Sequence, residues 1–151
     1  MAAGTGQCVD AAAAAVRVPP PAGDAAERAH MIDCTLTLPY PPSANRYWRH
    51  NRGRTHISGE GKAFRAAVAA AVTEQQATGT PPLTGRLAVA LEVRMPDHRK
   101  RDLDNLLKAT LDALTHAGVW QDDCQIDRLV LQRGPVTPPG CLVLTLTERT
   151  R

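Results

Sequence analysis

The sequence contains few aromatic residues and no long apolar run. Two Trp, two Tyr and one Phe are the only aromatic residues in 151. No stretch approaches the roughly 20 apolar residues that a membrane-spanning helix requires, so we expect no membrane contact. The alanine run Ala11–Ala15 lacks the basic flank and long apolar core of a secretory signal peptide. These absences favour a cytoplasmic protein.

Cysteine patterns typical of metal centres are also missing. The four cysteines, at positions 8, 34, 124 and 141, form no Cys-x-x-Cys pair and no zinc-finger spacing. Cys34 and Cys141 fall in segments that read as strands. Both therefore indicate small buried side chains in a reducing compartment.

The chain is long enough for one domain with a core, and no internal repeat is visible. Residues 1–30 are rich in Ala, Gly and Pro and contain no aromatic residue. This composition predicts a disordered extension. The compact domain is expected over residues 31–151.

Apolar periodicity in this domain predicts an α+β fold. Alternation indicates strands over 32–38, 87–95, 126–133 and 141–148, and helical spacing indicates helices over 58–77 and from 103 to Gly118. The order strand, helix, strand, helix, strand, strand favours a small mixed four-stranded sheet with both helices on one face. Residues 43–58 are expected to be a loop, and the linker 134–140 is compatible with antiparallel pairing of the last two strands.

The same pattern predicts which side chains cap the helices, which are buried and which are exposed. Ser58 is the expected N-cap of the first helix, and Ala67 belongs to its apolar stripe. Glu92 falls on the outer face of its strand and is expected to be exposed. Asp102 is the expected cap of the second helix, whose leucines share one face.

Acidic residues gather at both ends of this second helix. Asp102 and Asp104 lie at its start, and Asp122 and Asp123 follow its end. Carboxylates are the ligands that Mg²⁺ and Mn²⁺ prefer, and Lys108, one turn beyond Asp104, could stabilise negative charge. Helix capping, i,i+4 ion pairs and a turn explain the same spacing equally well.

Basic residues cluster in two stretches, although the net charge of +3 is modest. One cluster leads into the acids, and the other combines aromatic residues with arginines between Tyr40 and Arg54. Such clusters attract a polyanion, and aromatic residues can stack on unpaired bases. Alternatively, Tyr47 and Trp48 attach the segment to the core and the arginines are only solvated.

Two motifs in this order resemble the RusA family of Holliday-junction resolvases. The first is the stretch Leu38-Pro-Tyr-Pro-Pro-Ser-Ala-Asn-Arg-Tyr-Trp. The second is Arg-Asp102-Leu-Asp104-Asn-Leu-x-Lys108, continued by Asp122-Asp123-x-Gln-Ile. The resemblance covers roughly residues 31–149. It implies a homodimeric, Mg²⁺-dependent endodeoxyribonuclease that resolves four-way DNA junctions by paired symmetric nicks in recombination and repair.

The resemblance also implies roles for residues. Asp102, Asp104 and Asp123 would be catalytic and hold Mg²⁺ or Mn²⁺. Lys108 would be a catalytic basic residue, and Asp122 an alternative or auxiliary acid. The residues expected to contact DNA are Arg46, Tyr47, Trp48, Arg49, Arg52, Arg54, Arg99, Lys100, Arg101 and Asn105. Two other functions fit the sequence: a non-catalytic module that binds branched or single-stranded DNA, and a metal nuclease for flaps or RNA.

Overall fold

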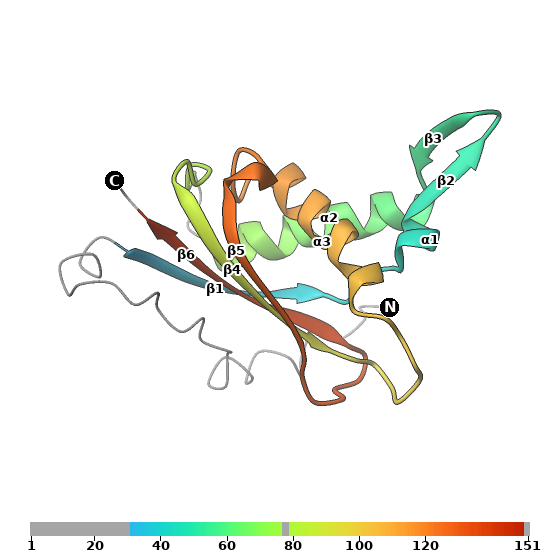
Figure 1. The fold of residues 1–151 in the computed structure, drawn as a ribbon. Helices are drawn as coiled ribbons and strands as arrows, with labels where there is room; N and C mark the ends of the chain where they lie inside the picture. The colour runs from blue at the N-terminus through green and yellow to red at the C-terminus, as the bar shows by residue number, and fades with distance from the viewer. Residues whose placement is uncertain (1–30, 77–78, 150–151) are drawn as a thin grey trace.

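The structure is a computed structural model that describes residues 31–76 and 79–149, so the predicted extension over 1–30 lies outside it. Figure 1 shows a sheet with its helices on one side and a hairpin that projects from the body. No helix in the described ranges is long and apolar enough to cross a membrane. The elements are β1 (Met31–Pro39), α1 (Ala44–Tyr47), β2 (Trp48–Asn51), β3 (Arg54–Ile57), α2 (Gly59–Gln75), β4 (Arg86–Arg94), α3 (Asp104–His116), the 3₁₀ turn η3 (Asp123–Gln125), β5 (Ile126–Arg133) and β6 (Cys141–Arg149).

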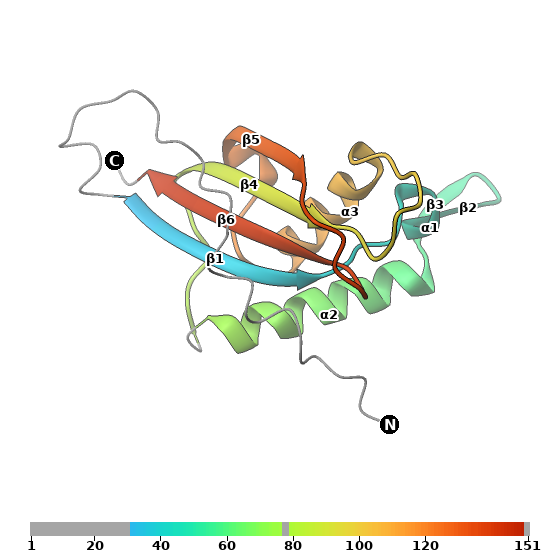
Figure 2. The same cartoon turned by 90° about the horizontal axis from the view of Figure 1, so that it is seen from below.

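The predicted mixed four-stranded sheet is confirmed, with the strand order β1-β6-β4-β5 (Figure 2). β4 and β5 are parallel, and β6 lies antiparallel to both β1 and β4. The expected pairing of the last two strands is wrong, because β6 enters between β1 and β4. The linker between β5 and β6 follows the end of β4, where the N–H groups of Gly134 and Thr137 donate to the carbonyls of Val93 and Met95, each at 2.9 Å.

Alternating residues of the sheet form the core beneath α2 and α3. Leu87, Val89, Leu91 and Val93 of β4 are each at most 1% exposed, as are Leu142, Leu144 and Leu146 of β6. α2 adds Phe64, Val68 and Val72, and Ser58 caps it as predicted, accepting from the Gly61 N–H at 3.0 Å. Cys141 is buried and Cys34 is half-buried. The apolar alternation therefore defines the face that the helices cover.

Glu92 is buried, which corrects the expectation that it is exposed. Its side chain is 7% exposed, and its Oε1 accepts from Arg94 Nε at 2.7 Å. β4 is an interior strand, and Gly134 packs directly on Glu92, where an added Cβ would meet Cγ at 2.7 Å. The cationic partner satisfies a carboxylate that this close packing removes from water.

Residues 43–58 are ordered as α1 and a β2–β3 hairpin, so the prediction of a loop is wrong. The hairpin closes through Arg52 and Gly53, which both have positive φ, 48° and 73°. Two positive φ values suit a two-residue hairpin turn because their twist matches the strands. The turn contains Arg-Gly in place of the more typical Asn-Gly, and the exposed strands have no apolar alternation to reveal them.

Candidate active site and nucleic-acid surface

Asp102 and Asp104 lie where the chain enters α3. The N-cap residue is Leu103, whose helical backbone and apolar side chain provide no side-chain cap, so the prediction that Asp102 caps this helix is wrong. Both aspartates are exposed. Neither carboxylate forms a hydrogen bond or an ion pair with a described residue. These two acids are therefore free to bind a ligand from solution.

Asp122 and Asp123 lie at the other end of α3. Asp122 caps η3, because its Oδ1 accepts from the Cys124 N–H at 2.8 Å. This hydrogen bond holds the pKa of Asp122 below its ordinary value. The Gln125 side chain completes the capping box and ties the turn to the carbonyls of Leu83 and Gly85. Asp122 thus has a structural task, which leaves Asp123 as the better candidate ligand of the pair.

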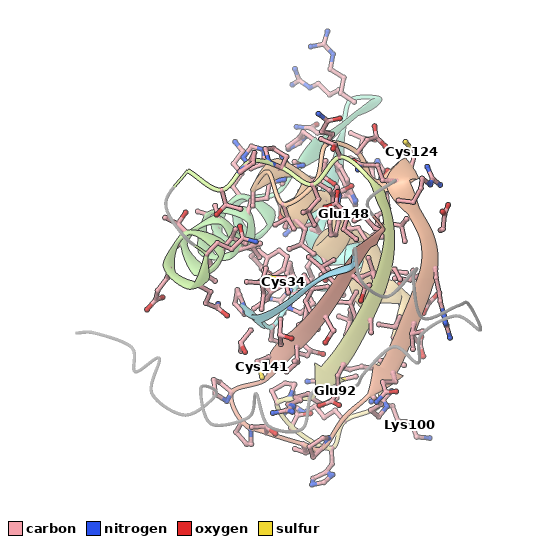
Figure 3. The ribbon with its side chains drawn as sticks, turned by 90° about the vertical axis from the view of Figure 1, so that its left-hand side faces the viewer. Cys34, Glu92, Lys100, Cys124, Cys141 and Glu148 are labelled. Atoms are coloured by element: carbon pink, nitrogen blue, oxygen red, sulfur yellow. The ribbon has the colours of Figure 1, made fainter. Side chains whose placement is uncertain are left out.

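One chain does not bring the two acidic pairs together. α3 has 13 residues and begins at Asp104, and at about 1.5 Å per residue its length of roughly 20 Å separates the two pairs. In Figure 3, Lys100, which precedes the first pair, and Cys124, which follows the second, lie toward opposite ends of the sheet. Within the described residues no three His, Cys, Asp or Glu side chains form a group that could hold a metal ion.

Lys108 lies on α3 one turn beyond Asp104. Its Nζ is 3.9 Å from Asp112 Oδ1, and its side chain is 67% exposed. This is one of the two i,i+4 pairs that the capping and ion-pair interpretation predicted. An exposed pair at this distance is weak, so the ammonium group can turn to an anionic ligand at little cost.

The basic loop between β4 and α3 is fixed by Asp97. Both carboxylate oxygens of Asp97 accept from the Arg101 guanidinium, one of them at 2.9 Å, and the Arg99 N–H donates to Oδ1 at 2.9 Å. These contacts hold the pKa of Asp97 well below its ordinary value. Arg133 also donates to the Arg101 carbonyl at 2.7 Å. The loop thereby presents Arg99 and Lys100 to solvent beside the free acids.

A groove of about 850 Å³ opens next to Asp102. Its lining includes four residues that were expected from the sequence to contact DNA: Arg46, Lys100, Arg101 and Asn105. Its lining also includes Tyr40, Phe64 and Ala67. Ala67 was expected on the buried stripe of α2 but is exposed here. The sequence indicated its basic and polar lining as DNA contacts, but nothing in the apolar pattern indicated a groove between these elements.

The hairpin carries exposed arginines on a shared face. Arg49 pairs with His56 across the strands, and Asn51 with Arg54, so Arg49 and Arg54 face the same side. Arg52 lies in the turn at the tip. All three arginines are exposed, and the hairpin projects beyond the body (Figure 1). This arrangement suits contact with an extended polyanion.

Tyr47 is not part of this exposed surface, which corrects its assignment to DNA contact. It is fully buried, and its hydroxyl accepts from Arg65 Nε at 2.8 Å. Burial raises the pKa of Tyr47. Trp48 is half-buried and packs edge-on against Tyr47, with ring centroids 5.1 Å apart. Tyr47 therefore attaches the hairpin to the core, as the alternative interpretation predicted.

Comparisons with known proteins identify the family of this chain. The family model of Endodeoxyribonuclease RusA matches residues 39–142, more than half of the chain. The Crossover junction endodeoxyribonuclease RusA of Escherichia coli strain K12 is 51% identical over 118 residues, covering 78% of this chain and 97% of that protein. The RusA protein of Enterobacteria phage 82 is 51% identical over 113 residues, covering 75% of this chain and 92% of that protein. The chain belongs to the RusA family of endodeoxyribonucleases.

Proposed function

We propose that this protein resolves four-way DNA junctions by paired symmetric nicks, in recombination and repair, and that a divalent cation supports the cleavage. Its relatives are named crossover junction endodeoxyribonucleases. The observation that carries the proposal is the free pair of carboxylates, Asp102 and Asp104, beside a groove lined by basic residues. Acidic side chains can hold a cation and basic side chains can bind phosphate, so this arrangement suits a phosphodiester substrate.

Asp102 and Asp104 fit Mg²⁺, with Mn²⁺ as the alternative. Mg²⁺ is commonly held by one or two carboxylates together with waters and substrate phosphate oxygens, so it does not need a closed protein cage. The two exposed carboxylates satisfy this requirement on one chain. When bound, the cation lowers the pKa of a coordinated water and offsets charge on the scissile phosphate.

A second copy of the chain supplies the third acid in this proposal. Asp123 lies at the far end of α3 from Asp104, so a two-fold dimer with antiparallel α3 helices would bring each Asp123 to the other chain's Asp102 and Asp104. Apolar surface is available along the same region, because Leu103, Leu107 and Leu111 are only partly buried. Leu129 of the edge strand β5 is 39% exposed. Two identical sites would account for two symmetric nicks.

The remaining residues bind and position DNA. Lys108 would face the negative charge that develops at the scissile phosphate. Arg46, Arg99, Lys100, Arg101 and Asn105 would contact the backbone that enters the groove. Arg49, Arg52 and Arg54 would contact one arm of the junction, with Trp48 supporting the base of the hairpin.

Cleavage of a labelled four-way junction with Mg²⁺ tests the proposal. Linear duplex, a flap and RNA serve as competing substrates. Asp104→Asn keeps the shape of the side chain but removes its charge, so nicking should fall by at least about 100-fold while binding persists. Asp112→Asn is the matched control on the same helix, and it should retain nicking. Preferential cutting of flaps or RNA would refute junction specificity, and binding without cutting by the wild type would favour a non-catalytic DNA-binding module.

A further inference from the structure

The groove beside Asp102 has a size that suits a small ligand. Its volume of about 850 Å³ falls within the roughly 300–1,000 Å³ that is usual for such sites. It forms where the proline-rich turn after β1, the first turns of α2 and the loop before α3 meet. The contacts proposed for the phosphate backbone use charged and polar residues of this lining and leave its apolar residues without a partner in the DNA.

Part of the groove's lining is apolar, and we call these residues its floor. Tyr40, Phe64, Ala63 and Ala67 line it, and the two alanines lie one helical turn apart and are exposed. The Tyr40 ring is held in place, because its hydroxyl donates to Met95 Sδ at 3.2 Å. Gly140 packs against the same ring, where an added Cβ would meet Cδ2 at 2.9 Å. A fixed aromatic ring in an open apolar groove is a platform on which a planar group can stack.

The rim of the groove is charged and polar. Lys100 forms no ion pair with a described residue, whereas Arg46 pairs with Glu60 at 2.9 Å and Arg101 pairs with Asp97. Ser43 and the Asn105 amide add hydrogen-bond donors and acceptors. A planar, hydrogen-bonding group attached to a phosphate matches this combination of floor and rim, and a nucleotide has this chemistry.

We propose that the groove receives one nucleobase, unpaired at the branch point of the DNA, and thereby selects the nucleotide beside the scissile phosphate. This inference rests on the proposed function, since it takes branched DNA as the substrate. Removing a base from the stack costs least where pairing is already disturbed, as it is at a branch point. Asp102 lines the same groove, so a base held there places its own phosphate near the free acids.

Binding of four-way junctions in the absence of divalent cation tests the proposal. Each branch-point nucleotide is replaced in turn by an abasic residue. Wild-type protein should bind the junction at least about fivefold more weakly when the abasic residue occupies one particular position. Ala67→Phe fills the groove. This variant should bind the intact junction and the junction with the abasic residue at that position with equal affinity. Ala66→Phe adds the same ring to an exposed neighbour that does not line the groove, so it should behave as the wild type.

Two results would overturn the base-binding groove. One is a wild type that binds every abasic junction as tightly as the intact one, and the other is an Ala67→Phe variant that still discriminates. Ala63→Leu provides a second filling variant if Ala67→Phe does not fold, as judged by thermal unfolding. A failure to cut junctions with Mg²⁺ would refute the proposed nuclease alone, because the affinity comparison requires no cleavage.

Discussion

The Ser58 hydroxyl donates a hydrogen bond to the backbone carbonyl of Arg46, with Oγ and O 2.5 Å apart. The N–H of Ser58 donates to the Tyr47 carbonyl at 2.9 Å, and its Oγ also caps α2. One serine thus closes the base of the β2–β3 hairpin and starts the helix that forms one wall of the groove. The direction of the hairpin is therefore coupled to the position of Arg46 at the groove.

Gly61→Ala should destabilise the contact between the β2–β3 hairpin and the start of α2. An added Cβ would meet Ile57 Cγ2 at 2.6 Å and the Tyr47 carbonyl oxygen at 2.9 Å. Overpacking of this kind costs about 1–3 kcal/mol in the free energy of unfolding, which urea denaturation measures. Gly59→Ala is the matched control, because nothing lies within 4 Å of its added Cβ. Equal stability of the two variants would show that the contact at Gly61 relaxes freely.

Arg49→Ala and Arg54→Ala should each weaken junction binding and reduce its salt dependence. If each arginine contacts one phosphate, the slope of log K against log salt concentration falls by about 0.9 per substitution. Thr55→Ala controls for disturbance of the hairpin, since Thr55 bonds His50 on the opposite face at 2.9 Å and carries no charge. Unchanged slopes in both arginine variants would remove the hairpin from the DNA-binding surface.

The Cys124 thiol should react slowly with iodoacetamide. Its hydrogen bond to the Asp122 carboxylate raises the pKa of the thiol, so less thiolate is present at pH 8. Asp122→Asn removes the negative charge, which should lower the thiol pKa and accelerate alkylation measured by peptide mass spectrometry. Alkylation of Cys34 in the same sample is the internal reference. An unchanged rate at Cys124 would contradict the hydrogen bond between its thiol and the Asp122 carboxylate.

Local patterns were enough to predict most of the elements. Alternation along β4 and β6 identified buried strands because every second side chain faces the helices. Ser58 was recognised as a cap because its hydroxyl can satisfy a free N–H of the first helical turn. The acids and the basic loop were recognised from residue type and from the two family motifs. Their roles in cleavage remain predictions.

Features that depend on distant contacts were not predictable in the same way. β6 inserts between β1 and β4 through pairings that no local period encodes. Glu92 lies on the outer face as expected, yet Gly134 and Arg94 enclose it. The separation of Asp104 from Asp123 follows from the length of α3, and the sequence had already predicted this helix. Residue types and spacing alone, however, do not exclude a loop that folds back beside the start of this helix.

In the proposed dimer, Asp104 of one chain and Asp123 of the other belong to the same site. Asp104→Asn and Asp123→Asn should each abolish nicking alone. When the two variants are co-expressed and form mixed dimers, one site receives both substitutions and the other receives neither. Random pairing makes half of the dimers mixed, each with one intact site, so total nicking should return to about one quarter of the wild-type level.

Nicking of a four-way junction by this co-expressed pair, with Mg²⁺, is the most direct measurement of such a shared site. Recovery as single, unpaired nicks is the predicted result. The combination of Asp102→Asn with Asp104→Asn is the control, and it should stay inactive, because each site of that mixed dimer contains one substitution. An Asp104→Asn and Asp123→Asn pair that forms mixed dimers and yet remains inactive would contradict a site built from two chains.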